Sequence, residues 1–158
     1  MDDPVTTLAS TRAGSEAQAL AESVAAAMWA RDVASQALGM RIVRVAPGVA
    51  ELAMTVRADM LNGHAICHGG FIFTLCDSAF AYACNSYNLN TVASGCSIDF
   101  LAPAREGDVL TALAQEMSVA GRTGVYDIGV VDARGERIAL FRGKSYRIKG
   151  HVIDAPAG

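Results

Sequence analysis

The chain has 158 residues, of which 52% are hydrophobic, and a formal net charge of −3 at pH 7, which suits one domain with a sizeable core and argues against a second. This charge disfavours nucleic acid as a partner, because neutralising phosphates requires a surplus of Lys and Arg on one face. The acidic N-terminus does not resemble a secretion signal, and the uncharged runs are too short or too polar to cross a bilayer, so we expect a cytoplasmic protein without membrane association.

Residues 1–14 are small and polar, so we expect a flexible N-terminal tail. A helix should begin at Ser15, because Ser15 and Gln18 fit a capping box in which each side chain satisfies a backbone donor near the other. Apolar residues then recur at three- and four-residue steps as far as Leu38, and Gly39 suits a left-handed helix stop. We predict this first helix at 15–38.

From Arg41 the pattern changes to that of β-strands. Residues 41–45 and 49–56 flank Pro47-Gly48, which favours a hairpin. After a second helix, turn signals separate further β-rich runs at 91–103, 108–118, 123–133 and 136–149. The order of helix, two strands, helix and four strands predicts an α+β fold with one antiparallel sheet. We place the domain at 15–150 and a C-terminal tail at 151–158.

The second helix, at 69–85, is apolar or small on nearly every side, so it must be buried, and a sheet wrapped around it would achieve this. Asp77 is its only charge. Desolvation raises the pKa of a buried carboxyl group, which suits a general base. Alternatively, Asp77 caps a neighbouring loop or pairs with an Arg.

His68-Gly69-Gly70 stands at the start of the same helix, after a loop at 59–68. Unpaired backbone amides and the helix dipole at this position can stabilise a developing oxyanion. Alternatively, the paired glycines only allow a sharp turn into the helix.

Two other chemistries are weaker interpretations of these residues. His64 and His68 have a spacing seen in metal sites, but they lie in a loop without a third ligand nearby, so we expect no metal. The four cysteines form no Cys-x-x-Cys pair, and we expect free, buried thiols rather than a nucleophile.

The ordered motifs resemble a known family. Asn62-Gly63 precedes His68-Gly69-Gly70 and then Asp77 with Ala79-Phe80-Ala81, and further matches follow at 91–94, 99–104, 121–127 and 141–143. Over roughly residues 25–148 the chain resembles the hotdog-fold acyl-CoA thioesterases, and specifically the phenylacetate-degradation branch.

The resemblance implies a sheet wrapped around a long central helix, and protomers that pair as a homodimer and assemble into a homotetramer. It implies hydrolysis of (hydroxy)phenylacetyl-CoA or a related aryl or short-to-medium acyl-CoA without a cofactor. Asp77 would be the general base or nucleophile, the Gly69 amide would polarise the thioester carbonyl, and Asn62 would orient substrate or water. His68 is grouped with these catalytic candidates, either as a general base or as a residue that packs or hydrogen-bonds at the junction of loop and helix.

Substrate contacts are expected from Gly70, Ser94, Arg122 and Thr123, with Ser94 helping to hold the water. Seven of the thirteen basic residues lie in the last quarter of the chain. Of these, Arg122, Arg142 and Lys144 either bind coenzyme A phosphates or are solvated strand ends.

Two rival functions remain at this point. A hotdog dehydratase would need a catalytic His opposite a carboxylate, and His68 is the candidate. A non-catalytic acyl-CoA sensor would bind the thioester without cleaving it. Helical geometry adds one further expectation, because Gly69 and Asp77 lie roughly 12 Å apart on one helix and so must serve one substrate from different chains.

Overall fold

The computed structural model describes residues 4–154. Its elements follow the predicted order, with a short helix and a 3-10 turn added. Along the chain they are α1 (Pro4–Trp29), α2 (Val33–Ala37), β1 (Arg41–Ala46), β2 (Val49–Thr55), η1 (Ala58–Met60), α3 (Gly69–Asn85), β3 (Thr91–Phe100), β4 (Val109–Ala120), β5 (Thr123–Val131) and β6 (Arg137–Arg147).

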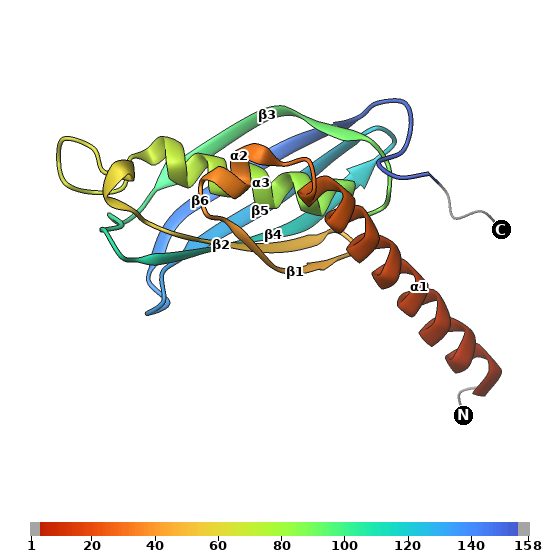
Figure 1. Ribbon diagram of the computed structural model, residues 1–158. Coiled ribbons are helices and arrows are strands. Elements are labelled where there is room, and N and C mark those ends of the chain that lie inside the picture. The colour runs from red at the N-terminus through yellow and green to blue at the C-terminus, as the bar shows by residue number, and fades with distance from the viewer. Residues whose placement is uncertain (1–3, 155–158) are drawn as a thin grey trace.

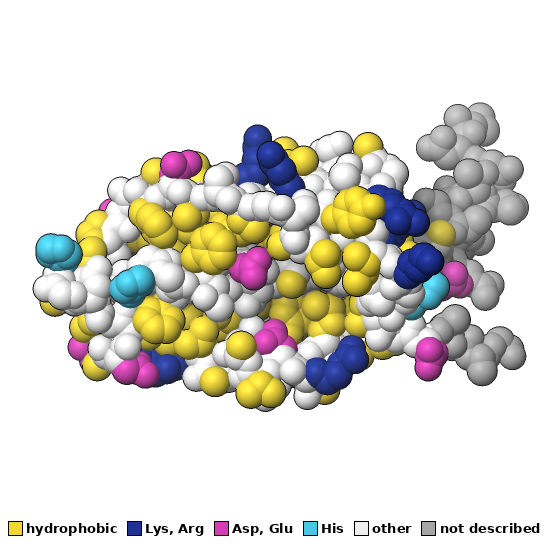
Figure 2. Space-filling view, turned by 90° about the horizontal axis from the view of Figure 1, so that it is seen from above, with side chains coloured by type: hydrophobic (Ala, Val, Ile, Leu, Met, Phe, Trp, Pro, Cys, Tyr) yellow, Lys and Arg dark blue, Asp and Glu magenta, His cyan; other side chains and the backbone are white. Residues whose placement is uncertain are grey.

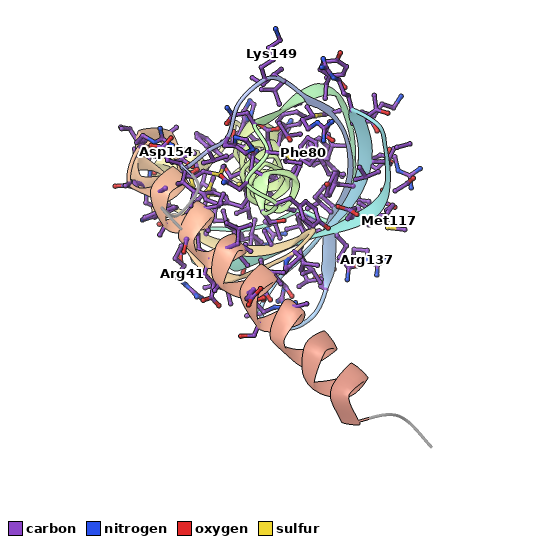
Figure 3. All side chains as sticks on the ribbon, turned by 90° about the vertical axis from the view of Figure 1, so that its right-hand side faces the viewer. Arg41, Phe80, Met117, Arg137, Lys149 and Asp154 are labelled. Atoms are coloured by element: carbon purple, nitrogen blue, oxygen red, sulfur yellow. The ribbon has the colours of Figure 1, made fainter. Side chains whose placement is uncertain are left out.

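The strands form one six-stranded sheet in the order β1-β2-β4-β5-β6-β3, and all neighbouring strands are antiparallel. Gly48 and Gly121, with φ of +70° and +60°, occupy the β1–β2 and β4–β5 turns, where a left-handed backbone favours glycine. The sheet curves around α3 (Figures 1 and 3). The predicted α+β fold, an antiparallel sheet around a long central helix, is confirmed.

The core lies between α3 and the inner face of the sheet. Phe80 of α3 points into this space (Figure 3), and its ring centre lies 5.4 Å from that of Tyr126 and 6.3 Å from that of Phe141. A Cβ atom on Gly143 would stand 2.8 Å from the Phe80 ring. Glycine at this position therefore lets β6 pass directly over the helix.

The N-terminal helix differs from its prediction. It begins at Pro4 rather than Ser15, so residues 4–14 are helical and not an irregular tail, while residues 1–3 lie outside the described residues. The capping box is wrong, because Gln18 lies inside the helix and donates to the Val45 carbonyl. The expected single helix also breaks before α2, where the Asp32 carboxylate caps the new helix by accepting from Ser35 N at 3.0 Å. The first part of α1 projects away from the sheet (Figure 1).

The two edges of the sheet differ. The β1 edge packs against α1. Most of β3 is exposed, and its apolar residues Val92 and Phe100 are 46% and 53% exposed. Cys96 on this strand is therefore exposed, which corrects the expectation of four buried thiols, whereas Cys67, Cys76 and Cys84 are buried and all four are free.

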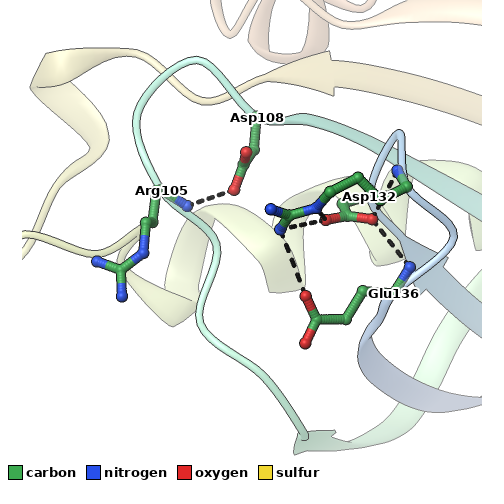
Figure 4. A network of polar contacts seen from close by, with 5 residues as sticks. Arg105, Asp108, Asp132 and Glu136 are labelled. Atoms are coloured by element: carbon green, nitrogen blue, oxygen red, sulfur yellow. Dashed lines mark hydrogen bonds and ion pairs between the residues drawn. The ribbon is translucent and has the colours of Figure 1, made fainter.

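The turn between β5 and β6 is closed by a polar network (Figure 4). The buried Asp132 carboxylate accepts the N–H groups of Arg134 and Glu136, each at 2.9 Å, and the Arg134 guanidinium. Burial opposes ionisation of Asp132, but these hydrogen bonds outweigh it and hold its pKa below the usual range. The network positions a turn and lies apart from the predicted site residues.

After β6 the described chain has no helix or strand, and residues 155–158 of the expected C-terminal tail lie outside the described residues. Ile153 is nevertheless attached to the domain, because its N–H and carbonyl both bond to the Asn88 side chain. The domain limits of 15–150 stay a prediction. Within residues 4–154 the structure has no helix with the length and apolarity needed to cross a membrane.

Candidate active site

The N-terminal end of α3 keeps one backbone donor free. His68 caps the helix, and its Nδ1 accepts from Gly70 N at 3.0 Å, while Phe71 N donates to the His68 carbonyl at 3.0 Å. The Gly69 N–H has no hydrogen-bond partner within the described part of the chain. Gly69 thus presents a single free donor at the positive end of the helix dipole, whereas the amide of Gly70 is occupied.

Asn62 presents a second free donor beside it. Its side-chain Oδ1 accepts from His64 N at 2.9 Å and from Ile66 N at 3.4 Å, which fixes the turn of the loop. No bond of the Asn62 Nδ2 is found among residues 4–154. Asn62 and Gly69 line the same cavity, of about 560 Å³. Two N–H donors on the lining of one cavity are the kind of group from which an oxyanion hole is built.

The rest of this cavity is largely apolar. Its other lining residues are Ile66, Cys67, Ile72, Phe100, Leu101, Ala102, Pro103 and Ala104. A Cβ atom on Gly69 would lie 2.7 Å from the Phe100 ring, so only glycine permits this close approach. Glycine at position 69 therefore serves the packing of β3 as well as the exposure of its amide.

Asp77 lies two helical turns further along α3. It is half-buried, and in the described residues its carboxylate has neither a hydrogen bond nor an ion pair. Burial raises its pKa above the usual range of an aspartate. Among the described residues Asp77 therefore neither caps a loop nor pairs with an Arg, and its carboxylate has the properties of a proton acceptor open to solvent.

The cysteines do not compete for this role. Burial raises the pKa of Cys67 to about 11 and that of Cys76 to about 12, and the nearby Asp77 charge raises the Cys76 value further. Thiols with such values are protonated near neutral pH and are poor nucleophiles. Within the described residues no three His, Cys, Asp or Glu side chains gather as a metal site would require.

Ser94 stands on the exposed edge strand at an irregularity in the pairing of β3 with β6. Its Oγ donates to the Lys144 carbonyl at 3.1 Å, which leaves its lone pairs available to accept from a water molecule.

Arg122 and Thr123 lie at the opposite end of the molecule from Asn62. They line a small cavity of about 50 Å³. Cys84, near the C-terminal end of α3, lines the same cavity. Arg147 lines the same cavity and was not among the expected substrate contacts; only the register of β5 and β6 brings it to Arg122. Arg142 instead forms a two-pronged ion pair with Asp127, both bonds at 2.6 Å, so it is not a free cation.

One face of the molecule combines apolar, acidic and basic side chains. Figure 2 shows hydrophobic side chains in a hollowed band with acidic side chains among them, and Lys and Arg side chains at its right-hand end. A further cavity, of about 690 Å³, is lined by residues of the sheet, including Leu113, Leu140 and the Asp127–Arg142 pair. Of the residues expected to contact the substrate or its phosphates, Arg142 alone lies on its lining.

A family model, curated relatives and solved structures point to one family. The family model of the thioesterase superfamily matches residues 64–139. The acyl-coenzyme A thioesterase PaaI of Escherichia coli is 53% identical over 126 residues, which are 80% of this chain and 90% of that protein. The structure of the PaaI protein from the phenylacetic acid degradation operon of E. coli matches with a TM-score of 0.84 and 51% identity, over 85% of this chain and 97% of that one. A hypothetical thioesterase from Streptococcus pneumoniae, solved with coenzyme A, matches with a TM-score of 0.68 and 25% identity, over 71% of this chain and 87% of that one.

Proposed function

The chain is a thioester hydrolase that belongs to the thioesterase superfamily, and from this premise we propose that it hydrolyses phenylacetyl-CoA, a ring-hydroxylated phenylacetyl-CoA, or a related aryl or short-to-medium acyl-CoA. The observation that carries the proposal is the unpaired, half-buried carboxylate of Asp77, set on the same helix as the free amide of Gly69. The acyl-CoA activity named for the E. coli relative and the coenzyme A bound by the S. pneumoniae protein support it.

The apolar cavity at Gly69 supports an aryl acyl group. Its walls include Ile66, Ile72 and Leu101, and its volume of about 560 Å³ is within the usual range for small-molecule sites. The thioester carbonyl would point toward the two free donors, the Gly69 N–H and the Asn62 Nδ2.

In the proposed reaction, Asp77 takes a proton from water as the water oxygen bonds to the thioester carbon. The charge that develops on the carbonyl oxygen is stabilised by the donors of Gly69 and Asn62. The intermediate then collapses with cleavage of the carbon–sulfur bond, and the coenzyme A thiolate takes the proton from Asp77. Ser94 accepts from the attacking water. His68 contributes by occupying the Gly70 amide and leaving the Gly69 amide free.

The alternative role for Asp77 is direct attack, which forms an anhydride that water then hydrolyses. Single-turnover hydrolysis in oxygen-18 water separates the two routes. A general base places the label in the acid during the first turnover and none in the protein. On the nucleophilic route, water that attacks the Asp77 carbonyl of the anhydride leaves the label in Asp77, so labelled protein after one turnover identifies that route.

We place each active site between two protomers. Gly69 and Asp77 are eight residues apart on α3, or roughly 12 Å along its axis, so one thioester cannot touch both groups of a single chain. The uncovered edge strand β3, with Val92 and Phe100 exposed, supports pairing of two copies along this edge. Asp77 of one protomer would then act with Asn62 and Gly69 of its partner.

The wider assembly is a further part of the proposal. Pairs of dimers would form a homotetramer, and the outer sheet face, with Leu113 and Leu140 in its large cavity, is available for that contact. The reaction as written requires no cofactor, since coenzyme A is part of the substrate, and we expect it to take place in the cytoplasm.

The proposed activity is tested by incubating the protein with phenylacetyl-CoA and a thiol reagent, followed by a panel of aryl, short and medium acyl-CoAs. Free thiol is expected, with the highest kcat/KM on aryl substrates. An acyl-CoA sensor would bind without releasing thiol, and a dehydratase would convert a hydroxyacyl-CoA without releasing thiol. Absence of free thiol across the panel would therefore reject hydrolysis.

The shared site is tested by complementation. Homodimers of Asp77→Ala and of Asn62→Ala should both be strongly impaired. A mixed dimer collects both substitutions in one site and leaves the other intact, so co-refolding should restore activity. Mixed dimers purified with a different tag on each chain that stay as inactive as their parents would place the site within one chain.

A further inference from the structure

The end of β3 carries an aromatic side chain that lies against the first turn of α3. Phe100 is paired with Ala139 of β6, which is buried, so the Phe100 side chain is on the face of the sheet that turns toward the helix. A Cβ atom on Gly69 would stand 2.7 to 3.2 Å from three atoms of the Phe100 ring, so one edge of the ring rests on Gly69. Phe100 is nevertheless 53% exposed, because β3 is an edge strand. The ring therefore contacts the residue with the free amide and also faces open space.

Phe100 also differs in kind from the rest of the cavity at Gly69. Among the residues that the structure describes, it is the only aromatic one on the lining, and no lining residue is charged. Three of the other lining residues, Cys67, Ile72 and Ala104, are small or aliphatic and are buried. Aliphatic walls favour a saturated ring as much as an aromatic one, because burial of apolar area does not require a π system. Discrimination between an aryl acyl group and a saturated one of the same size therefore depends on Phe100.

The position of the ring suits contact with an acyl group. A thioester carbonyl bonded to the Gly69 N–H has its oxygen about 3 Å from that nitrogen. In a phenylacetyl group one methylene separates the carbonyl carbon from the ring, so the acyl ring also stays beside Gly69. Two rings beside the same glycine are within the range of about 4.5–7 Å between ring centres at which aromatic pairs are favourable.

We propose that Phe100 selects aryl acyl groups, because its ring stacks on the ring of an acyl group whose carbonyl is held by the Gly69 amide. This inference rests on the proposed function for the reaction and for the position of the carbonyl. Within a shared site, Phe100 acts on the protomer that supplies Asn62 and Gly69, and Asp77 comes from the other protomer. A saturated acyl group of the same size enters the same cavity but gains nothing from the Phe100 ring face.

The competing explanation is a contact between protomers. Phe100 lies on the exposed edge strand along which two copies are proposed to pair, and its ring would then only fill that contact. Under that explanation, replacing the ring would weaken the dimer and change the turnover of every acyl-CoA by the same factor.

The test compares two substrates that differ only in the ring. Phenylacetyl-CoA has an aromatic ring, and cyclohexylacetyl-CoA has a saturated ring with the same number of carbon atoms. The wild type should favour phenylacetyl-CoA. In Phe100→Leu, which keeps an apolar side chain, the ratio of kcat/KM for phenylacetyl-CoA to that for cyclohexylacetyl-CoA should fall at least about fivefold. Phe100→Tyr keeps the ring and should stay within about twofold of the wild-type ratio.

Size-exclusion chromatography measures the dimer content of each variant. An equal loss of kcat/KM on both substrates, or an unchanged ratio in Phe100→Leu, would overturn the selective role of Phe100.

Tyr146→Leu is the matched control. Tyr146 on β6 is also aromatic and 40% exposed, but it does not line the cavity at Gly69, so its replacement should leave the ratio unchanged.

Mixed dimers show which protomer supplies the ring. In a dimer of one Asp77→Ala chain and one Asn62→Ala chain, the intact site takes Asn62 and Gly69 from the Asp77→Ala chain. Phe100→Leu added to that chain should lower the ratio, whereas the same change in the Asn62→Ala chain should not. A fall in the ratio only with the second placement would overturn stacking beside Gly69. If the mixed dimer is inactive, the shared site is wrong and the ratio in the homodimer decides the role of Phe100.

Binding of two thioethers that cannot be hydrolysed separates this inference from the proposed function. Calorimetry compares S-(2-phenylethyl)-coenzyme A with S-(2-cyclohexylethyl)-coenzyme A. The wild type should bind the phenyl thioether at least about fivefold more tightly, and Phe100→Leu should bind the two about equally.

A wild type that shows this preference, lost in Phe100→Leu, but hydrolyses neither thioester would overturn the proposed function and support the role of Phe100. A wild type that hydrolyses phenylacetyl-CoA, with the same preference in Phe100→Leu as in the wild type, would overturn the role of Phe100 alone. A wild type that hydrolyses neither thioester and binds both thioethers equally would overturn both.

Discussion

The two ends of α3 differ in how their polar groups are hydrogen-bonded. At the C-terminal end, the Asn85 side chain bonds to the carbonyls of Ala81 and Thr91 and accepts from Thr91 N. The Ser86 hydroxyl donates to the Ala83 carbonyl and accepts from Gly48 N. At the N-terminal end, His68 satisfies Gly70 and leaves the amide of Gly69 without a partner.

This difference separates stability from chemistry along one helix. The C-terminal end is buried, and its polar groups are paired, so it anchors the helix in the sheet. The N-terminal end opens into a cavity and keeps donors that a substrate can use. Asp77 lies between them, with a carboxylate that the fold leaves unpaired. Substitutions at the C-terminal end should therefore mainly change the free energy of unfolding, and those at the N-terminal end should mainly change turnover.

The largest expected effect comes from Asp77. Asp77→Asn should lower kcat by at least about 100-fold, because the amide cannot accept the proton of the attacking water. The circular dichroism spectrum and dimer content should match the wild type, since the side chain makes no ion pair in the described structure that the change would break. Turnover near the wild-type rate in a folded sample would remove Asp77 from the mechanism.

The next effect tests the anchored end. Asn85→Ala removes a buried side-chain amide, and the N–H and carbonyl of Thr91 lose their hydrogen bonds to it. The free energy of unfolding measured in urea should therefore fall by about 2–3 kcal/mol. At a temperature where the variant stays folded, its kcat should be within about twofold of the wild type. A loss of kcat that parallels the loss of stability would show that the two ends are not separable.

A smaller effect is expected from the cap at the open end. His68→Ala should lower kcat by about tenfold, because the Gly70 amide loses its acceptor and the first turn that presents Gly69 loosens. The unfolding free energy should fall by about 1 kcal/mol, as for other cap removals.

His68→Asn is the matched rescue, since asparagine is a favoured cap residue and keeps an acceptor for the Gly70 amide. It should recover most of the lost kcat. His64→Ala, in the same exposed loop, should change neither quantity. If His68→Asn is as slow as His68→Ala, then the imidazole acts on the substrate and not through the cap.

Much of this fold could be predicted from local patterns. A helix that is apolar on all sides requires a surrounding sheet, and the turn glycines Gly48 and Gly121 separate alternating runs. Two features were missed because they depend on contacts distant in sequence. The sheet order puts β3 at an edge, which exposes Cys96, and the β5–β6 register puts Arg147 beside Arg122. The predicted helix start at Ser15 is wrong because the capping signal there is only local, and the residues upstream of it are also compatible with a helix.

The candidate site was predictable in part. Motif order identified Asn62, Gly69 and Asp77, and two donors of the set line one cavity. The sequence cannot indicate which atoms remain free, because the Asn62 oxygen is used by its own loop and the Gly70 amide by His68. Those occupied atoms decide which donors a substrate meets.

The smallest expected effect concerns the free energy of unfolding, which burial of the Asp77 carboxylate lowers. Its pKa is raised in the folded protein by burial, so folded Asp77 keeps its proton at pH values where the unfolded chain has already released it. Between the ordinary value of 3.8 and the raised value, folding therefore becomes less favourable as pH increases, and above that window the loss stays constant. Asp77→Asn lacks this loss, so its unfolding free energy in urea should exceed that of the wild type at neutral pH and converge with it in acid.

Asp127→Asn is expected to change stability in the opposite direction. Arg142 lowers the pKa of Asp127, so loss of the Asp127 carboxylate should lower the free energy of unfolding at neutral pH. An Asp77→Asn variant less stable than the wild type at neutral pH would mean that the assembled protein supplies Asp77 with a favourable partner, and the carboxylate would then not be the unpaired base on which the contrast between the two ends of α3 depends.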